Sequence, residues 1–397
     1  MRFLHTGDWH VGKTLKGRSR QDEHEAVLIE IVDIARRERV DAPLIGGDTF
    51  ESFAPAPDAE RLVYSALAEC VGEGIPVVLI GGNHDHPRRL AALTRFLDRL
   101  CIFVRPEPCR PADGGVIELP SGDRSEVARI AVLPFVQESR IVDACRLFDP
   151  EEQWYQAYAD RVARMLALLA QGFQASSVNV LMAHLLVDGA RVGGGERQLH
   201  LGQIYAVTPH QLPDSAQYIA LNHLHRPQRV ATAAWTEYSG SPLQLDFGEV
   251  DQAKRVVLVE AHPGRSVEVR SVPLTAGRRL LDDAGTLDEL RTRADTLRGA
   301  FLRVELRAPR AEPGLVARVK EMLPDVLEVR CVYTEAPPAV ATTGVNLVDD
   351  SSAQTGSSLD PTSRLRAYYR QERGAELPET IGTLFTQLYE ETLRETA

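Results

Sequence analysis

Hydrophobic residues along the first 260 positions occur in short runs that alternate with stretches of helical spacing. The short runs predict strands at residues 2–5, 43–45, 77–80, 130–133, 178–183, 218–221 and 256–260. Helices are predicted at 22–37, where Val27, Ile31 and Ile34 recur at helical spacing, and at 58–71, which begins at Pro57 and Asp58. This strand–helix–strand order predicts an α/β fold with helices on the faces of a sheet.

The remaining residues predict three further parts. Residues 273–335 read as a small αβαβ unit, with helices at 287–297 and 315–323 and strands at 301–306 and 326–332. Residues 336–361 are rich in Ala, Pro, Thr, Ser and Gly, which is typical of a linker. Within residues 362–397, a helix at 381–395 has Leu384, Phe385, Leu388, Tyr389 and Leu393 on one face. Such a tethered helix has no core of its own, so it must dock onto its own domain, residues 1–272, or onto a partner.

The composition restricts the class of protein. Hydrophobic residues make up 44% and charged residues 25%, as in ordinary globular chains. No run approaches 18 apolar residues, and the chain opens on a strand rather than on a leader, so we expect no membrane segment. The 5 cysteines form no CxxC pair, which indicates neither a disulfide framework nor a zinc ribbon. We therefore expect a reducing, cytoplasmic location.

The net charge of -11 disfavours a nucleic-acid partner, but basic residues gather at particular places. An acid-free run after His10 contains Lys13, Lys16, Arg18 and Arg20. Arg88 and Arg89 follow His84, and Arg226 and Arg229 follow His225. These side chains are either solvated loop residues or contacts for phosphate, and their charge alone leaves both interpretations open.

Residues of the kinds that bind metals follow five of the predicted strands. They are Asp8 and His10, then Asp48, then Asn83, His84 and Asp85, then His184, and finally His223 and His225. In a wound α/β sheet the carboxyl ends of the strands line one crevice, so we expect these side chains to meet there. Imidazole, carboxylate and amide ligands suit Mn²⁺, Fe²⁺ or Zn²⁺ better than Mg²⁺ or Ca²⁺. So many ligands require two ions, which a bridging carboxylate can hold about 3.5–4 Å apart.

The same series resembles the five-part signature of the calcineurin-like metallophosphoesterases. Residues 4–12, 189–197 and 238–243 also resemble the bacterial SbcD nucleases, and this resemblance extends over essentially the whole chain. It implies a β-sandwich flanked by helices, with residues 1–272 as the nuclease domain and 273–335 as a small α+β capping domain. It also implies that residues 362–397 dock on the coiled-coil base of an ABC-type ATPase, SbcC. The chain has no GxxxxGK[ST] pattern with which to hydrolyse ATP itself.

The resemblance also implies a role for each site residue. Asp8, His10 and His225 would hold one Mn²⁺ ion, Asn83, His184 and His223 the other, and Asp48 would bridge them. His84 would contact the phosphate and protonate the leaving oxygen, with Asp85 orienting its imidazole. Asn222 stands where the family has Gly before the first histidine of its last motif, and Glu51 stands where an Asp is common. We expect Glu51 to support the ligands rather than to bind metal.

DNA cleavage at double-strand ends and hairpins, as exonuclease and endonuclease, is the activity that the resemblance implies. Candidate DNA contacts are Lys13, Lys16, Arg18, Arg88, Arg197 and Arg226. A homodimer is expected through helices near 58–71 and 87–100, where Leu62, Leu90, Leu93 and Phe96 are expected to be exposed. Two alternatives stay open: a small-molecule phosphodiesterase or phosphatase on the same fold, and a catalytically silent scaffold that binds DNA ends.

Overall fold

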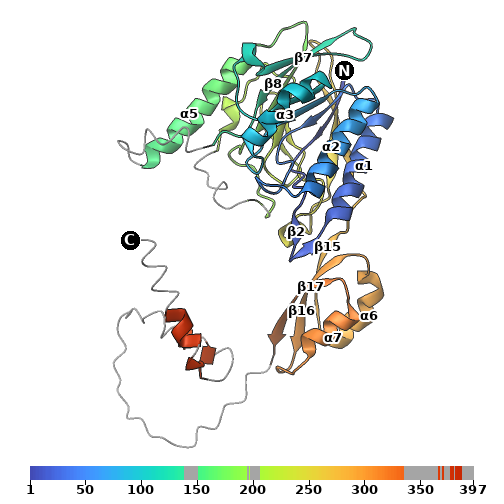
Figure 1. Ribbon diagram of the computed structural model, residues 1–397, viewed down its shortest axis with the longest axis vertical. Coiled ribbons are helices and arrows are strands. Elements are labelled where there is room, and N and C mark those ends of the chain that lie inside the picture. Colours follow the sequence, from blue (N-terminus) through green and yellow to red (C-terminus); the bar gives the residue numbers. More distant parts are fainter. Residues whose placement is uncertain are drawn as a thin grey trace, which may run out of the picture. The chain divides into compact units, whose positions relative to one another are not determined.

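The computed structural model describes residues 1–137, 151–194, 196 and 206–334, and in the C-terminal part residues 365–366, 369–370, 376–379 and 381–386. The chain divides into two compact units, Met1–Pro337 and Pro338–Ala397. The first unit contains two large sheets and a smaller one (Figure 1).

The first large sheet has the strand order β14-β13-β1-β4-β5-β6. Its strands β1 (Arg2–Thr6), β4 (Ala42–Ile45), β5 (Val77–Ile80) and β6 (Ile102–Arg105) are parallel. Antiparallel β13 (Arg255–Glu260) and β14 (Glu268–Pro273) complete it. The parallel arrangement brings the carboxyl ends of β1, β4 and β5 to one edge.

The second large sheet has the order β11-β12-β10-β9-β8-β7. Its parallel strands are β8 (Val127–Leu133), β9 (Val178–His184), β10 (Tyr218–Asn222) and β12 (Trp235–Tyr238). The edge strands β7 (Val116–Pro120) and β11 (Gln228–Val230) are antiparallel. The five ligand-bearing strands therefore come from two sheets, which agrees with the β-sandwich that the resemblance implies and corrects the single wound sheet inferred from the strand order.

Apolar side chains between the two sheets form the central layer of this sandwich. Because side chains alternate along a strand, Phe3 of β1 faces the second sheet while Leu4 faces the helices. The helices α1 (Gln21–Arg37), α2 (Pro57–Gly72) and α3 (Pro87–Arg99) cover the first sheet. On the opposite side, α5 (Glu151–Ala170) covers the second sheet through Val162 and Leu166 (Figure 1). The result is a four-layer α/β sandwich.

The small unit contains one more strand than the sequence pattern predicted. Strand β15 (Leu280–Gly285) precedes α6 (Leu287–Leu297), β16 (Phe301–Ala308), α7 (Leu315–Met322) and β17 (Val326–Tyr333). The order is therefore βαβαβ, with three parallel strands in the order β15-β16-β17. The pattern missed β15 because its residues Asp282 and Asp283 break the apolar run.

This small unit packs against the large sandwich through a hairpin formed by β2 (Thr14–Leu15) and β3 (Arg18–Ser19). Leu15 and Phe247 form an apolar cluster with Leu280 and Phe301. The guanidinium of Arg18 lies 5.2 Å from the centre of the Phe301 ring. The main-chain N–H of Leu280 donates to the Gln244 side chain at 2.7 Å.

In the C-terminal unit, Pro338–Ala397, residues 381–386 are helical, with Ile381 and Leu384 exposed. The linker expected at 336–361 lies outside the described residues, as do Leu388, Tyr389 and Leu393 of the expected helix. Among the described helices, none combines the length and hydropathy needed to cross a membrane.

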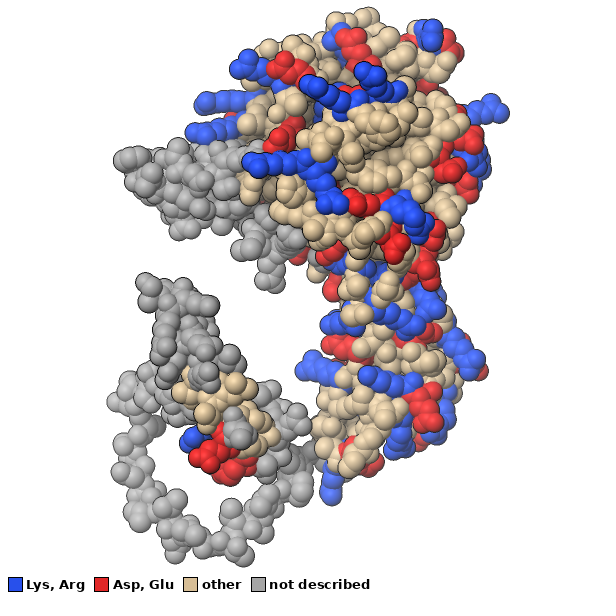
Figure 2. Space-filling model, in the orientation of Figure 1, with Lys and Arg blue, Asp and Glu red and all other residues tan. Residues whose placement is uncertain are grey.

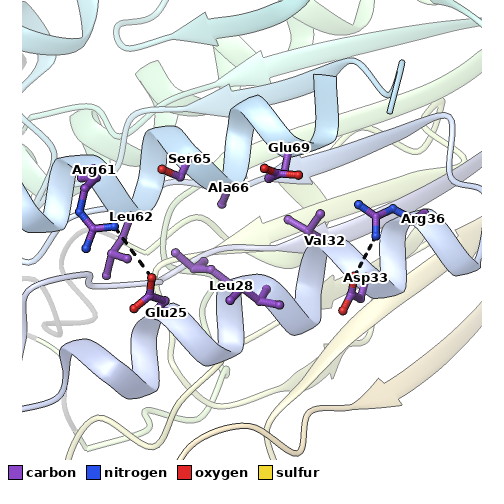
Figure 3. A pocket seen from close by; sticks show the side chains of 11 residues that line it. Glu25, Leu28, Val32, Asp33, Arg36, Arg61, Leu62, Ser65, Ala66 and Glu69 are labelled. Atoms are coloured by element: carbon purple, nitrogen blue, oxygen red, sulfur yellow. Dashed lines mark hydrogen bonds and ion pairs between the residues drawn. The ribbon is translucent and has the colours of Figure 1, made fainter. Parts of the chain in front are cut away.

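A groove of about 380 Å³ runs between α1 and α2 (Figure 3). Leu28, Val32 and Leu62 line it, and ion pairs lie along it between Arg61 and Glu25 and between Arg36 and Asp33. None of the candidate metal ligands lines this groove.

The residues predicted to be exposed for a homodimer differ in their exposure. Leu62 and Leu90 are both 4% exposed, so their expected exposure was wrong, whereas Phe96 on α3 is 62% exposed.

Candidate metal centre

Seven residues from the five strand ends meet in one buried cluster. Loops after β1, β4 and β5 supply Asp8, His10, Asp48 and Asn83, and His184 ends β9. His223 and His225 follow β10. Main-chain hydrogen bonds of 2.9 Å from Asp8 to Gly47 and from His10 to Asp48 join the first two loops. The crevice lies between the two sheets rather than along one of them.

The backbone is strained at four of these seven residues. Asp8, His10 and Asp48 have φ angles of 49°, 47° and 48°, and His223 has a φ of 112°. Non-glycine residues rarely adopt positive φ, and such strain gathers at functional sites. Gly47 and Gly82 allow the close approach of the loops, because a Cβ on either would lie closer than 3.0 Å to neighbouring atoms of the cluster.

On one side of the cluster, two histidine nitrogens with lone pairs point at one another. The Nδ1 atoms of His10 and His225 lie 2.8 and 3.0 Å from the carboxylates of Glu51 and Glu249. Because a carboxylate only accepts, each Nδ1 carries a proton, and in a neutral ring each Nε2 then offers a lone pair. These two Nε2 atoms are 3.1 Å apart, so a proton or a metal ion must lie between them. Two nitrogens about 2.1 Å from one metal ion lie about 3.0–3.4 Å apart, so the spacing fits a shared ion.

The other side of the cluster shows the same arrangement around Asn83. The Nδ1–H of His184 donates to the Gly46 carbonyl at 2.8 Å, so its Nε2 is an acceptor. That Nε2 lies 2.9 Å from Asn83 Oδ1 and 3.6 Å from Asp48 Oδ2. His223 Nδ1 is also 2.9 Å from Asn83 Oδ1. These atoms, together with the Asp48 carboxylate, converge on a point that a second cation fits.

Asp48 is shared between the two sides. Its Oδ2 lies 3.6 Å from Nε2 of both His10 and His184. Potential ligand atoms of His10, Asp48 and His84 lie within 4.8 Å of one another, and so do those of Asp48, His184 and His223. Burial raises the pKa of Asp8 to about 8, because removal from water disfavours the ionised carboxylate. A bound cation would offset this penalty. The cluster is therefore suited to two metal ions.

His84 and Asp85 take different partners from those expected. The Nδ1 atom of His84 lies 2.7 Å from the carbonyl oxygen of Glu51, which holds the ring. The Asp85 carboxylate instead accepts from the main-chain N–H groups of Thr49, Phe50 and Gly82. The expected contact between Asp85 and the His84 imidazole was wrong, because Asp85 points into the loops and holds them together.

Comparison with known proteins agrees with this geometry. Residues 1–226 match the family model of the calcineurin-like phosphoesterases. The SbcD chain of the SbcCD nuclease of Bacillus subtilis is 31% identical over 400 residues, which cover 98% of this chain and 97% of that relative. The chain belongs to the SbcD nuclease family.

Other SbcD-family relatives are similarly distant in sequence. The SbcD chain of the Rhodobacter capsulatus nuclease is 33% identical, and the match covers 81% of this chain and 84% of that relative. That of Escherichia coli is 31% identical, with 69% of each chain covered.

Among solved structures, a dimetal phosphatase from Danio rerio is 14% identical with a TM-score of 0.41, and the match covers 70% of this chain and 99% of that structure.

Two supporting carboxylates of this SbcD-family site differ in how well the sequence indicated them. Glu51 bonds to His10, which agrees with the expected supporting place. Glu249 was missed, although it is 0% exposed and bonds to His225. It lies in a short 3₁₀ turn, Phe247–Glu249, which follows the 238–243 segment but belongs to none of the motifs, so no sequence signal marked it.

The expected DNA contacts are only partly free to bind a substrate. Lys13 pairs with Glu51, Lys16 with Glu328 of the small unit, and Arg226 with Asp251. Arg18 lies against the small unit, 3.8 Å from Asp325. Lys16 and Arg18 therefore join two parts of this chain, and with 46% of each side chain exposed their contact with DNA stays a prediction. Arg88 is exposed, and Arg197 lies outside the described residues.

Proposed function

We propose that this chain is a Mn²⁺-dependent DNA exonuclease and endonuclease that works with an SbcC-type ATPase. The observation that carries the proposal is the convergence of acceptor atoms on two points that share Asp48. Two divalent ions held there would supply a hydroxide nucleophile and neutralise charge on a phosphodiester. Similarity over nearly the whole chain to the nuclease subunit of Bacillus subtilis supports a nucleic acid as the substrate.

Each residue of the cluster would have a separate role in metal binding or catalysis. Asp8, His10 and His225 would hold one ion, Asn83, His184 and His223 the other, and Asp48 both. His84 would place its Nε2 against the phosphate and pass a proton to the leaving oxygen, because its Nδ1 is already committed to the Glu51 carbonyl. Asp85 would contribute by fixing the loops that carry Asp48 and Asn83.

A basic cavity beside the metal centre would carry the DNA backbone. It has a volume of about 560 Å³ and is lined by Arg191, by Arg226 and Arg229, which follow His225 in the chain, and by Asp251. Arg229 stacks on the Trp235 ring at 3.8 Å, which leaves its outer N–H groups available for phosphate. On the face in Figure 2, basic side chains are interspersed with acidic ones, so that face offers no continuous basic surface for DNA.

The small unit, residues 273–335, would cap the site, and the C-terminal segment, 362–397, would dock on the ATPase. Support for a capping role is the packing of Phe301 and Leu280 against the hairpin that follows His10. Exposed Ile381 and Leu384 support docking. A homodimer would form through α3, where Phe96 and Leu100 are 62% and 41% exposed; Phe96→Asp should make the protein monomeric in analytical ultracentrifugation.

Labelled linear duplex and a chromogenic phosphodiester, each assayed with Mn²⁺ and with EDTA, test the activity. We expect Mn²⁺-dependent cleavage of the duplex and slow turnover of the small ester, and we expect Asp48→Ala to be inactive on both. Turnover of the small ester alone would favour a small-molecule phosphodiesterase. Binding of DNA ends without cleavage would favour a scaffold. Anomalous scattering from MnCl₂-soaked crystals should show two adjacent peaks among the seven ligands.

A further inference from the structure

Asn222, the residue at which this chain departs from the family signature, lies at the centre of a buried hydrogen-bond chain. It is the last residue of β10 and is 0% exposed. Its Nδ2 atom donates to Oδ2 of Asp8 at 3.0 Å and to Ser239 Oγ at 2.8 Å. Its Oδ1 atom lies 2.9 Å from Nε2 of His5.

The space for this side chain exists only because two neighbours are glycines. A Cβ on Gly7 or on Gly46 would lie closer than 3.0 Å to atoms of the Asn222 amide. Both glycines belong to loops that carry metal ligands, Asp8 after β1 and Asp48 after β4. The amide therefore fills a gap between the two loops and bonds to one of their ligands.

His5 extends the chain across the space between the two sheets. It lies on β1, while both of its partners, Tyr218 and Asn222, lie on β10 of the opposite sheet. Its Nδ1 is 2.9 Å from the Tyr218 hydroxyl, and both side chains are fully buried. The sequence pattern gave no reason to single out His5, because its partners are more than 200 positions away.

The donors and acceptors in this chain can have only one direction. When it binds a metal ion, Asp8 is a carboxylate that only accepts, so the Asn222 NH₂ group must face Asp8 and its Oδ1 must face His5. Since Oδ1 also only accepts, His5 must carry its proton on Nε2. Burial lowers the pKa of His5 to about 4, so the ring is neutral at pH 7 and its Nδ1 accepts from Tyr218. The order of donation is Tyr218 to His5, His5 to Asn222, and Asn222 to Asp8.

We propose that Asn222, oriented by His5 and Tyr218, is a positioning residue that fixes the Asp8 carboxylate for its metal ion. This inference rests on the proposed metal site. Within the described residues, the Asp8 carboxylate also accepts from the main-chain N–H of His223, at 3.1 and 3.3 Å. The amide thus sets which carboxylate oxygen faces the ion, and it does so without competing as a ligand, because its NH₂ group only donates.

Isothermal titration of metal-free full-length protein with MnCl₂ tests the proposal. Asn222→Ala should weaken binding of the ion held by Asp8 by about 10–100-fold, the usual effect of losing a supporting hydrogen bond, and should leave the other ion bound within about threefold. Tyr218→Phe, which removes only the first donor of the chain, should produce a smaller change in the same direction. Asn179→Ala provides the control, because the Asn179 side chain is also buried and bonds to the main chain of Gln174, remote from every ligand.

Thermal melting of each variant separates positioning from folding. The proposal is overturned if Asn222→Ala binds both ions as tightly as the wild type, or if Asn179→Ala weakens metal binding equally at equal loss of stability. If Asn222→Ala does not fold, Tyr218→Phe decides, and unchanged binding by that variant overturns the chain. A wild-type protein that binds no pair of ions would instead refute the proposed metal site.

Discussion

Glu249 and Lys254 form a buried ion pair behind His225. Single and double replacements in this pair should change the stability of the protein and its affinity for metal in different patterns. Glu249 is 0% and Lys254 8% exposed, and their charged atoms are 2.7 Å apart. Glu249 also bonds to His225 Nδ1 at 3.0 Å and to the Leu245 N–H at 3.0 Å. Lys254 donates further bonds to the His225 carbonyl and to Ser241.

The expected magnitudes follow from these contacts. Lys254→Met leaves a buried carboxylate without its cation, and Glu249→Gln leaves a buried ammonium without its anion, so each should cost about 3–5 kcal/mol of unfolding free energy. The double variant buries no unpaired charge. Its loss should therefore be smaller than the sum of the single losses by at least about 2 kcal/mol.

Metal affinity should follow a different pattern. Glu249 fixes the proton on Nδ1 of His225 and leaves Nε2 as the ligand atom, so Glu249→Gln should weaken Mn²⁺ binding by about 10–100-fold. Lys254→Met keeps that contact and should bind Mn²⁺ nearly as the wild type does. The double variant should recover stability but not affinity.

Urea denaturation followed by tryptophan fluorescence, with calorimetric titration of Mn²⁺, measures both quantities on the same samples. Losses of stability that simply add in the double variant would show that the pair is not coupled. Wild-type Mn²⁺ affinity in Glu249→Gln would show that this carboxylate does not orient His225.

Asp48→Ala should be the most damaging ligand change, with both ions lost in metal analysis, since its carboxylate faces both halves of the cluster; retention of either ion at full affinity would contradict bridging. His84→Ala should lower DNA cleavage by about 10²–10⁴-fold while metal and DNA binding stay near wild type, and loss of metal would make it a ligand instead. Removal of residues 361–397 should abolish capture of SbcC in a pull-down yet leave Mn²⁺-dependent cleavage intact, and undiminished capture would exclude docking by this segment. Burial would raise the pKa of Glu249, but Lys254 and His225 outweigh burial and lower it below 4.5, so its stabilising effect is present above that pH and lost below it. Stability should therefore fall more steeply below pH 4.5 in the wild type than in Glu249→Gln, and equal slopes would contradict this.

The sequence by itself determined the elements and the list of candidate ligands. Apolar runs predicted β5 at residues 77–80 and α6 at 287–297 with the bounds that the structure has, because alternation and helical spacing are local properties. Pro57 predicted the start of α2, because proline fits the first turn of a helix, where its missing N–H would have no partner. The ligand series was also readable, because each candidate directly follows a strand, and the ends of parallel strands lie at one edge of a sheet.

Only the tertiary structure decided which polar groups meet. Glu249 contacts His225 from 24 positions away, and His5 contacts Asn222 from 217 positions away, so no local spacing could pair them. Asp85 is adjacent to His84 in sequence, yet its carboxylate points to the amides of another loop. Lys16 pairs with Glu328, a contact that no local spacing indicated. A hydrogen bond or ion pair depends on where folding places both partners, and the sheet pairing that brings them together is specified by the packing of the whole sandwich.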